Sequence, residues 1–403
     1  MKNVAVINVC DFGSTGRITM ELHRYLLGQG YNSLFCYGRG DRHEDQSFFK
    51  FCGEVERYIH AGLARLTGYQ GCFSSLATKK LIRRLRNQNV EAVFAGNLHG
   101  YYLNEKMFFD YIIKDNIKLV YLMLDEYPLI GKCAFVEGCT EFENGCKRCI
   151  GLKRYPANLF FNRSREIFQM KMNAYQQMKR TAFVGPQVVI DLARKSPLLK
   201  DKNLVALDET IDVSFYTPRD TTELKQELGI ASDKYVCVCI APYKGDKNSR
   251  KGVPYYIELA RSLENDERFV FVQVGYLAED KSQLPSNYIP LGFINDQNKL
   301  CEYYSLGDLF VFPSLADSMP SACIGAMSCG TPLLCFDISG MSYMATPNIS
   351  TFVEARNVEA MKQVVLTWPK KNPEMIQTCR DYAVGRYDNK VYNQKLIDLA
   401  ECL

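Results

Sequence analysis

The sequence predicts an α/β chain built from two doubly wound parallel sheets. Short apolar, β-branched runs alternate with amphipathic helical segments along the whole chain, and this rhythm restarts after about residue 200. Strands that alternate with helices form parallel sheets with both faces covered. A length of 403 residues suits two or three domains. We therefore expect two Rossmann-like domains that face a central cleft.

The first half supplies the first of these sheets. Its predicted strands are residues 2–10, 33–37, 90–95 and 118–124, and its predicted helices are residues 18–27 and about 104–114. The opening apolar run is short, and Asp11-Phe12-Gly13 follows it where a signal peptide would have small residues at a cleavage site. We interpret this run as a buried strand.

The second half repeats the pattern. Its predicted strands are residues 235–240, 269–274, 309–312 and 332–336, and its predicted helices are residues 253–264, 296–305 and 321–329. We place the join at Gly185-Pro186. The expected domains are residues 1–185, with a Cys-rich excursion at 133–149, then residues 186–372, then closing helices at 373–403.

The composition is that of an ordinary globular protein. Apolar residues make up 47% and charged residues 23%, and the net charge is +4, too small to indicate a nucleic-acid partner. No apolar run approaches the ~18 residues that span a bilayer. Most of the 16 cysteines stand singly in apolar runs, where a thiol acts as a small hydrophobe. We expect a reduced, cytoplasmic protein.

A glycine-rich turn follows the first predicted strand. Gly13 and Gly16 lie where the first helix begins, and such a turn lets the backbone approach an anionic ligand at a helix N-terminus. The Gly-x-x-Gly spacing differs from the dinucleotide fingerprint Gly-x-Gly-x-x-Gly. The alternative is a tight turn without a ligand.

Two loops of the second half carry candidate phosphate-binding groups. Arg250-Lys251 lies between a strand and a helix, where a cationic pair could hold a diphosphate, although a solvated charge run is the alternative. Asp317-Ser318-Met319-Pro320-Ser321 precedes another helix, which Asp317 or Ser318 could cap. The N-terminus of that helix could hold a phosphate, or the segment is an ordinary capped helix.

The four clustered cysteines have the spacing C-x5-C-x6-C-x2-C. They are Cys133, Cys139, Cys146 and Cys149. The final Cys-x2-Cys is typical of half of a tetrahedral zinc site. The sequence thus predicts one structural zinc, with reduced thiols or a redox pair as alternatives.

Polar residues follow two predicted strands of the first half. His99 and Asp125 both lie just past a strand end, where cleft residues belong; a helix or turn cap is the alternative for Asp125. The four histidines include no adjacent pair and no His-x3-His, so a histidine metal site is not expected. Basic stretches at 79–86 and 153–180 suit either solvated helix faces or contact with an anionic membrane.

Taken in order, these segments resemble family-4 retaining glycosyltransferases of the GT-B fold, in particular the bacterial capsule and exopolysaccharide branch. The resemblance rests on Asn97–Asn104, on Asp125–Phe135 with its downstream cysteines, on Arg250-Lys251-Gly252 and on Ala316–Pro332. The order of these motifs along nearly the whole chain is more specific than any one of them. The resemblance implies a nucleotide-sugar donor in the second domain and an acceptor in the first.

The chain departs from that family at several positions. The family's Glu-x7-Glu pair falls on Asp317 and Gly325, so the second Glu, which contacts the donor ribose in the family, is missing. The His before Asp125 is replaced by Leu124. We expect the glycine to leave room for a bulkier donor group or an altered ribose position.

The resemblance implies a sugar transfer with retained configuration from a UDP- or GDP-sugar to a glycan or lipid-linked acceptor. Its implied catalytic residues are His99, Asp125 and Asp317. Its implied donor-binding residues are Gly13, Gly16, Arg250, Lys251, Ser318, Pro320, Ser321 and Gly325. No catalytic metal is expected. The alternatives are a non-catalytic binding protein of the same fold and a sugar-nucleotide epimerase. The implied location is the cytoplasm, peripheral to the inner face of the membrane.

Overall fold

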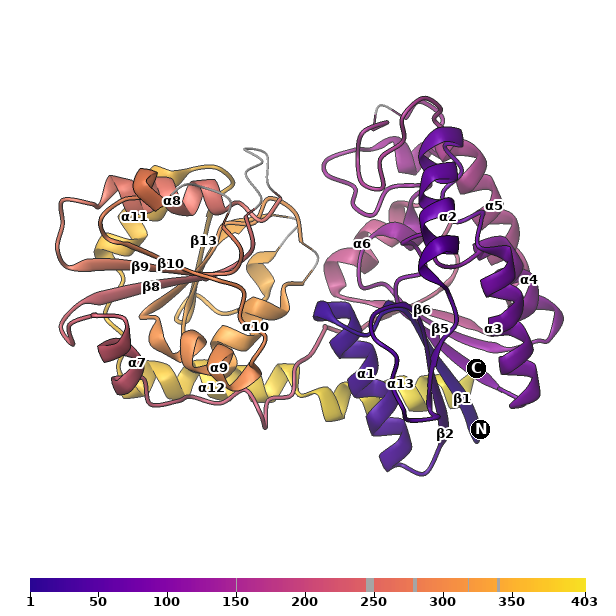
Figure 1. The fold of residues 1–403 in the computed structure, drawn as a ribbon, viewed down its shortest axis with the longest axis horizontal. Helices are drawn as coiled ribbons and strands as arrows, with labels where there is room; N and C mark the ends of the chain where they lie inside the picture. Colours follow the sequence, from indigo (N-terminus) through magenta and orange to yellow (C-terminus); the bar gives the residue numbers. More distant parts are fainter. Residues whose placement is uncertain (150, 244–249, 278–280, 318, 339–340) are drawn as a thin grey trace. The chain divides into compact units, whose positions relative to one another are not determined.

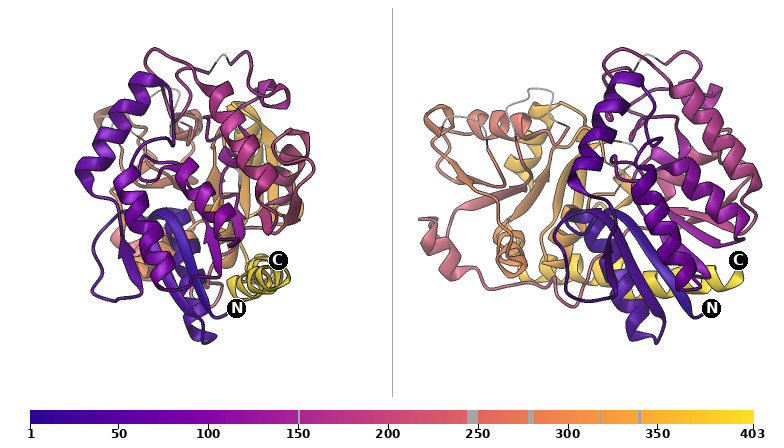
Figure 2. Two further views of the ribbon diagram at one scale, coloured as in Figure 1. Left: turned by 90° about the vertical axis from the view of Figure 1, so that its right-hand side faces the viewer. Right: turned by 45° about the vertical axis from the view of Figure 1, so that its right-hand side comes forward.

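The chain folds into two compact units, each with a parallel sheet and helices on both faces (Figures 1 and 2). A computed structural model describes residues 1–149, 151–243, 250–277, 281–317, 319–338 and 341–403. Unit 1 comprises Met1–Glu209 and Lys390–Leu403, and unit 2 comprises Thr210–Asn389. The predicted α/β class with two Rossmann-like domains is confirmed.

Unit 1 contains a sheet in the order β3-β2-β1-β4-β5-β6-β7, in which every neighbouring pair is parallel. Its strands are β1 (Asn3–Cys10), β2 (Asn32–Arg39), β3 (Phe48–Lys50), β4 (Ala92–Ala95), β5 (Lys118–Leu122), β6 (Thr181–Gly185) and β7 (Asn203–Ala206). Its helices are α1 (Gly13–Gly28), α2 (Glu54–Thr67), α3 (Ser75–Asn87), α4 (Glu105–Lys114), α5 (Ser164–Gln177), α6 (Gln187–Lys195) and α13 (Asn389–Cys402).

Both faces of this sheet are buried, which explains the continuous apolar runs of its strands. In β1, Val4 and Val6 pack in one hydrophobic cluster with side chains of α1 and α13, whereas Ala5 and Ile7 pack in another with side chains of α3, α4, α5 and α6. Successive residues of a strand point to opposite faces. Each strand therefore contributes to two cores at once.

Unit 2 contains a parallel sheet in the order β10-β9-β8-β11-β12-β13. Its strands are β8 (Tyr235–Ile240), β9 (Phe269–Val274), β10 (Tyr288–Leu291), β11 (Leu309–Phe312), β12 (Leu333–Asp337) and β13 (Ser350–Glu354). Its helices are α7 (Thr222–Glu227), α8 (Val253–Ser262), α9 (Gln297–Leu306), α10 (Ser321–Ser328), α11 (Val358–Thr367) and α12 (Pro373–Tyr387). One continuous apolar core fills this unit.

The division between the units differs from the boundary expected at Gly185-Pro186. β7 pairs with β6 and extends the first sheet, so unit 1 continues to Glu209. The expected closing helices also separate, because α12 belongs to unit 2 and α13 to unit 1. Leu396 and Ile397 of α13 are buried with side chains of α1. Packing of the apolar face of α13 against the core of unit 1 therefore decides where this helix lies, although that core is formed by residues far away in sequence.

Both sheets reverse their strand order at one point. In unit 1 the reversal lies between β1 and β4, and in unit 2 it lies between β8 and β11. Open α/β sheets bind ligands beyond the carboxyl ends of the strands at such a point. The loops that follow these four strands are therefore where candidate site residues are expected.

Candidate active site

In unit 2, two cations and a carboxylate meet beyond β8 and β11. Lys251 Nζ lies 2.9 Å from Asp317 Oδ2, and Arg250 Nη1 lies 3.5 Å from the same oxygen. Arg250 also donates to the carbonyl oxygen of Ala316 at 2.6 Å. β8 and β11 are adjacent strands, so residues 66 or 67 positions apart come together.

A glycine allows these two loops to approach each other. Gly252 has φ +69°, and a Cβ atom at this position would lie 1.7 Å from the carbonyl oxygen of Pro313. Any side chain here would push the loop away from the end of β11. Arg250 and Lys251 therefore pack against the segment that follows β11, and the alternative of a freely solvated charge run does not describe them.

The helix α10 begins beside this cluster. Pro320 is its N-cap residue and makes no side-chain cap hydrogen bond, and Ser321 is its first residue. The prediction that Asp317 could cap this helix is wrong, because the Asp317 carboxylate pairs with Lys251 instead. Ser318, the other predicted cap, lies outside the described residues. The positive end of the α10 dipole and two cations lie on one side of unit 2.

Gly325 lies inside α10 and is buried. A Cβ atom here would lie 3.0–3.4 Å from the ring and hydroxyl atoms of Tyr304 on α9. The structure thus gives a packing reason for this glycine, since it allows α10 to lie close to α9. A larger side chain at this position would first meet Tyr304.

In unit 1, the structure brings His99 and Asp125 together, as expected for residues that follow neighbouring strands. His99 follows β4 and Asp125 follows β5, and the distance from His99 Nε2 to Asp125 Oδ2 is 2.6 Å. Both side chains are buried. Asp125 Oδ1 accepts a hydrogen bond from the backbone N–H of Tyr127 at 3.0 Å. The Asp125 carboxylate therefore links the His99 ring to the backbone of the loop that follows β5.

A polar network that the sequence did not indicate lies behind this pair. Glu105 accepts a hydrogen bond from the hydroxyl of Tyr127, and the Tyr127 ring lies 5.0 Å from the His99 ring. Lys171 Nζ lies 3.3 Å from the centroid of the Tyr127 ring. Burial raises the pKa of Glu105 and lowers the pKa of Lys171 to about 8. The only sequence signal is Lys171, a lysine among apolar residues on the buried face of α5, which falls within the basic stretch 153–180.

The turn after β1 is held by its two glycines. Gly13 begins α1 with φ +71°, and a Cβ atom on Gly16 would lie 2.7 Å from the backbone carbonyl carbon of Asp11. Gly16 thus lets α1 pack against the end of β1. The same strand end carries another pair that the sequence did not indicate, in which His43 Nε2 lies 2.8 Å from Asp11 Oδ2.

The structure does not support the predicted zinc site. All four clustered cysteines are described, yet among the described residues no group of three or more His, Cys, Asp or Glu side chains is placed to hold a metal ion. The Cys149 thiol contacts Cys133, and the hydroxyl of Ser164 lies 3.4 Å from its sulfur. The hydrogen bond from Cys133 lowers the pKa of Cys149 to about 4.

Two buried lysines bind the segments on either side of the Cys-rich excursion. Lys132 donates to the carbonyl oxygens of Leu152, Arg154 and Pro156. Lys171 donates to those of Tyr127, Ile130 and Gly131 at 2.7–3.0 Å. Hydrogen bonds from a charged donor are about twice as strong as neutral ones. They fix the irregular backbone before and after the four cysteines.

The predicted basic stretches are partly exposed. Residues 79–86 belong to α3, whose Leu81 and Leu85 are buried, whereas its Lys and Arg side chains are exposed except for the half-buried Arg84. In the second stretch Lys171 is buried, whereas Arg163 and Arg165 lie closer to the surface. No helix of the described residues is long and apolar enough to cross a membrane.

Two doubly wound parallel-sheet units form the GT-B fold. Solved structures of this fold align with the whole chain. WaaG, a glycosyltransferase involved in lipopolysaccharide biosynthesis, aligns with a TM-score of 0.68 at 16% identity, over 98% of this chain and 99% of its own. Anabaena Alr3699/HepE in complex with UDP aligns with a TM-score of 0.69 at 11% identity, over 100% of both chains.

Sequence comparison finds similarity in unit 2. Residues 220–385 match the family model of glycosyl transferases group 1. WcaC of Escherichia coli (strain K12), a glycosyl transferase assigned to colanic acid biosynthesis, is 22% identical in an alignment 361 residues long that covers 81% of this chain and 81% of its own. TuaC of Bacillus subtilis (strain 168), assigned to teichuronic acid biosynthesis, is 23% identical over 169 residues, 41% of this chain and 42% of its own.

Proposed function

We propose that this chain is a retaining, family-4 glycosyltransferase that moves a sugar from a UDP- or GDP-sugar to a glycan or lipid-linked acceptor. The observation that carries the proposal is the cluster of Arg250, Lys251 and Asp317 beside the N-terminus of α10, within the part of the chain that matches glycosyl transferases group 1. The relatives named for colanic and teichuronic acid biosynthesis support a role in surface polysaccharide synthesis. The proposal places the reaction in the cytoplasm at the inner face of the membrane.

The unit 2 cluster would hold the donor. In the transfer the bond from the sugar C1 atom to the diphosphate oxygen breaks, and negative charge develops on the leaving nucleoside diphosphate. Lys251 and Arg250 would bind this charge with Pro320 and Ser321 at the positive end of α10, and Asp317 holds the two cations in place. The solved Alr3699/HepE structures with UDP and with UDP-glucose support a nucleotide-sugar donor on this fold.

The unit 1 pair would meet the acceptor. The acceptor oxygen would bond to C1 on the face that the diphosphate leaves, which retains configuration, and its proton would pass to the departing phosphate oxygen. His99 would orient the acceptor hydroxyl, and Asp125 positions the His99 ring. Gly13 and Gly16, in the turn after β1, would let a ligand approach the N-terminus of α1. This chemistry requires no catalytic metal.

Product analysis distinguishes this proposal from its rivals. The protein is incubated with a panel of UDP- and GDP-sugars, with and without glycan and lipid-linked acceptors, and the products are analysed by mass spectrometry. We expect an acceptor heavier by one sugar residue and an equal amount of nucleoside diphosphate. An epimerase would give an isomeric sugar nucleotide without any acceptor. Nucleotide binding without any product would indicate a non-catalytic binding protein.

A single substitution tests the donor site. Lys251→Ala should weaken the binding of a nucleoside diphosphate by about 1.5–3 kcal/mol, because a charge-assisted hydrogen bond is lost. Isothermal titration calorimetry measures this change. Lys234→Ala, at the other end of β8, is the matched control and should bind as the wild type does. An unchanged dissociation constant for Lys251→Ala would exclude this cluster as the diphosphate site.

A further inference from the structure

The outward face of α2 is apolar. Its exposed side chains are Val55 (74% exposed), Tyr58 (66%), Ile59 (57%), Leu63 (38%) and Leu66 (47%). With 3.6 residues per turn, these positions share one face, and the buried His60 and Ala64 lie on the other. A surface helix normally carries polar groups on the side away from the core. The exposed apolar side chains of α2 therefore suggest that another surface covers this helix face.

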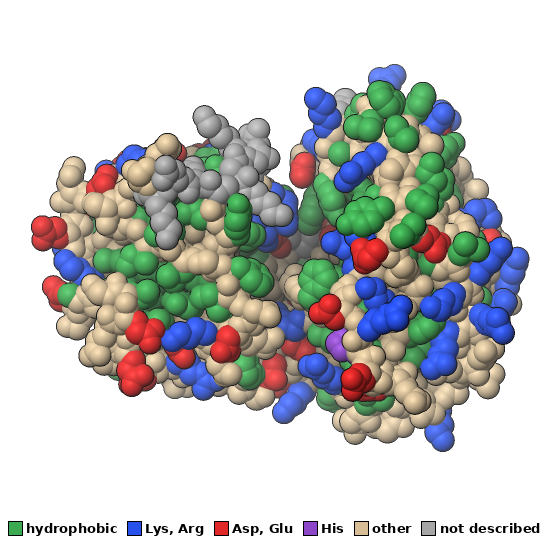
Figure 3. Space-filling view, viewed as in Figure 1, with side chains coloured by type: hydrophobic (Ala, Val, Ile, Leu, Met, Phe, Trp, Pro, Cys, Tyr) green, Lys and Arg blue, Asp and Glu red, His purple; other side chains and the backbone are tan. Residues whose placement is uncertain are grey.

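A second exposed apolar segment lies against the end of α2. Leu159, Phe160 and Phe161 are 58%, 68% and 54% exposed. The N–H of Leu159 donates to the carbonyl oxygen of Arg65 at 2.8 Å, so this segment is fixed to the helix. We call the outward face of α2 together with residues 159–161 the apolar surface. Figure 3 shows hydrophobic side chains over α2, with Lys and Arg groups around them.

The sequence around the apolar surface is strongly basic. Residues 54–86 contain seven Lys and Arg against two Glu, and residues 147–166 contain six against one. Both glutamates of the first stretch have partners, because Glu54 pairs with Arg57 and Glu56 accepts from the N–H of Ala77. Arg163 lies 5.8 Å from the ring centroid of Phe161. Cations therefore border the exposed apolar side chains.

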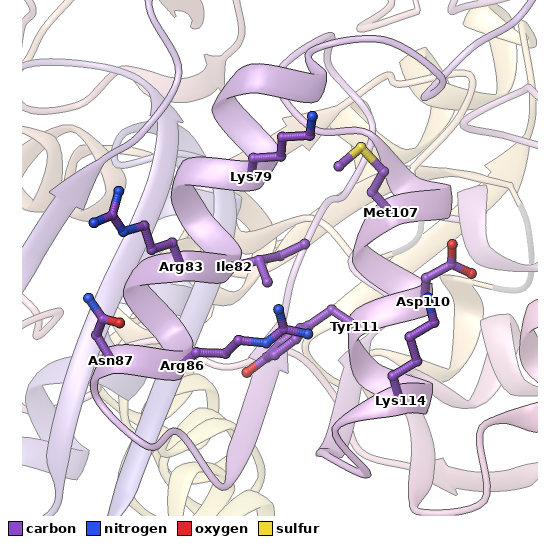
Figure 4. Close-up of a pocket in the computed structure, with 9 residues that line it drawn as sticks. All are labelled: Lys79, Ile82, Arg83, Arg86, Asn87, Met107, Asp110, Tyr111 and Lys114. Atoms are coloured by element: carbon purple, nitrogen blue, oxygen red, sulfur yellow. The ribbon is translucent and has the colours of Figure 1, made fainter.

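The positive charge continues along α3. A groove of about 380 Å³ between α3 and α4 is lined by nine residues (Figure 4). Four of them are Lys79, Arg83, Arg86 and Lys114, and one is acidic. The start of α3 contacts α2 through the bond between Ala77 and Glu56. The basic groove and the apolar surface therefore belong to connected helices.

The apolar surface reaches the His99–Asp125 pair. Tyr155 is 56% exposed, and its ring lies 5.9 Å from the ring of His99. Lys132 holds the neighbouring carbonyl oxygens of Arg154 and Pro156. Leu159, four residues after Tyr155, already belongs to the apolar surface. A short, internally bonded segment thus connects this surface to the candidate acceptor site.

We propose that the apolar surface docks unit 1 onto an anionic phospholipid bilayer. Apolar side chains bordered by Lys and Arg suit the boundary between acyl chains and anionic headgroups. The excess of Lys and Arg over Glu in residues 54–86 and 147–166 complements the negative charge of anionic headgroups. Through Tyr155, docking would present the headgroup of a lipid-linked acceptor to His99, and this last part alone rests on the proposed function.

Vesicle sedimentation without any sugar nucleotide tests the docking. The wild type should bind vesicles of phosphatidylcholine with phosphatidylglycerol, bind pure phosphatidylcholine vesicles more weakly, and lose binding as salt increases. Ile59→Ser/Phe160→Ser should lower the partition coefficient by about tenfold, because two apolar anchors are lost. Both side chains are exposed, so the fold should persist by circular dichroism. Phe293→Ser, 78% exposed in unit 2, is the matched control and should bind normally.

Two results would overturn the proposal. One is a double variant that binds anionic vesicles as tightly as the wild type. The other is a wild type that ignores vesicles but forms a dimer that the double variant loses in analytical ultracentrifugation, since the apolar surface would then be a protein interface. The vesicle assay contains no sugar nucleotide, so its failure would contradict the docking proposal alone. A failure of sugar transfer in the product analysis would contradict the proposed function alone.

Discussion

The contact between His99 and Asp125 shows how single residues depend on the sheet around them. The side chains are 26 positions apart in sequence, and the parallel pairing of β4 with β5 brings the two strand ends together. The Asp125 carboxylate serves both the His99 ring and the backbone of Tyr127. We interpret Asp125 as a positioning residue for His99.

Asp125→Asn should lower kcat on the order of 100-fold, because an amide orients and stabilises the imidazole ring less well than a carboxylate. The KM for the donor should stay near the wild-type value, and the pH profile of kcat should shift. Steady-state kinetics over a range of pH measures all three. Asp115→Asn, which removes a surface pair with Arg86, is the matched control. If kcat and its pH profile are unchanged, Asp125 has no role in the reaction.

Among the elements, α1 shows how a glycine decides packing. Gly16 faces the end of β1, whereas Gly28 of the same helix has no atom within 4 Å of a Cβ position. The two glycines therefore serve different purposes, and only the structure distinguishes them.

Gly16→Ala should lower the free energy of unfolding by about 1–3 kcal/mol, because a methyl group would overlap the backbone of Asp11. Gly28→Ala should be neutral or stabilising by about 0.5–1 kcal/mol, since alanine loses less entropy in a helix. Urea unfolding monitored by circular dichroism measures both variants. Equal stability of the two variants would contradict the close packing of α1 on β1.

The segment between β5 and α5 depends on Lys171. Its three carbonyl partners lie 40–44 residues away in sequence, and Glu105 and Tyr127 complete the network. A buried charge with this many partners is costly to remove, because the partners remain buried and unpaired.

Lys171→Met should lower the free energy of unfolding by about 3–5 kcal/mol, as for other broken buried charge networks. It should also reduce activity, because the loop carrying Asp125 loses its anchor. Lys179→Met, at an exposed position just past α5, is the matched control and should change stability by less than about 0.5 kcal/mol. Limited proteolysis between residues 126 and 156 provides a local readout. A Lys171→Met protein that resists protease as the wild type does would refute the anchoring role.

At the scale of the whole molecule, the two units differ in their titratable groups. All four histidines lie in unit 1, and the single tryptophan, Trp368, lies in unit 2. Burial lowers the pKa of His23 and of His60 to about 4, from an ordinary value of about 6.5. Both imidazole rings are therefore neutral in the folded protein. The His23 ring contacts the hydroxyl of Ser33, and the His60 ring contacts the hydroxyl of Ser74.

Mild acid should destabilise unit 1 selectively. Between about pH 6.5 and pH 4 the unfolded chain binds more protons at these histidines than the folded chain, so the free energy of unfolding falls as the pH falls. From pH 7.5 to pH 5.0 the loss should be roughly 2 kcal/mol for each histidine. Circular dichroism during urea unfolding reports both units, and Trp368 fluorescence reports unit 2.

The matched variant is His60→Gln, which should reduce the pH dependence measured by circular dichroism without altering the fluorescence transition. A fluorescence midpoint that shifts with pH as strongly as the circular dichroism midpoint would show that histidine burial is not the cause.

The sequence by itself determined the α/β class, the two doubly wound units and the strand ends at which His99, Asp125, Arg250 and Lys251 lie. These features depend on apolar periodicity and on glycines at turns, which are properties of neighbouring residues. The individual helices and strands that these local patterns predicted lie within a few residues of their observed bounds, but strands such as β3, β6, β7, β10 and β13 were not predicted.

Features that depend on contacts between residues far apart in the sequence could be determined only from the tertiary structure. It showed that β7 and α13 complete unit 1, that Lys171 is an internal anchor and not part of a basic surface, and that the clustered cysteines are not grouped for a metal. It also showed the exposed apolar face of α2, a helix that was not predicted from the sequence. Burial and charge pairing are set by residues far away in the chain, and no local pattern contains them.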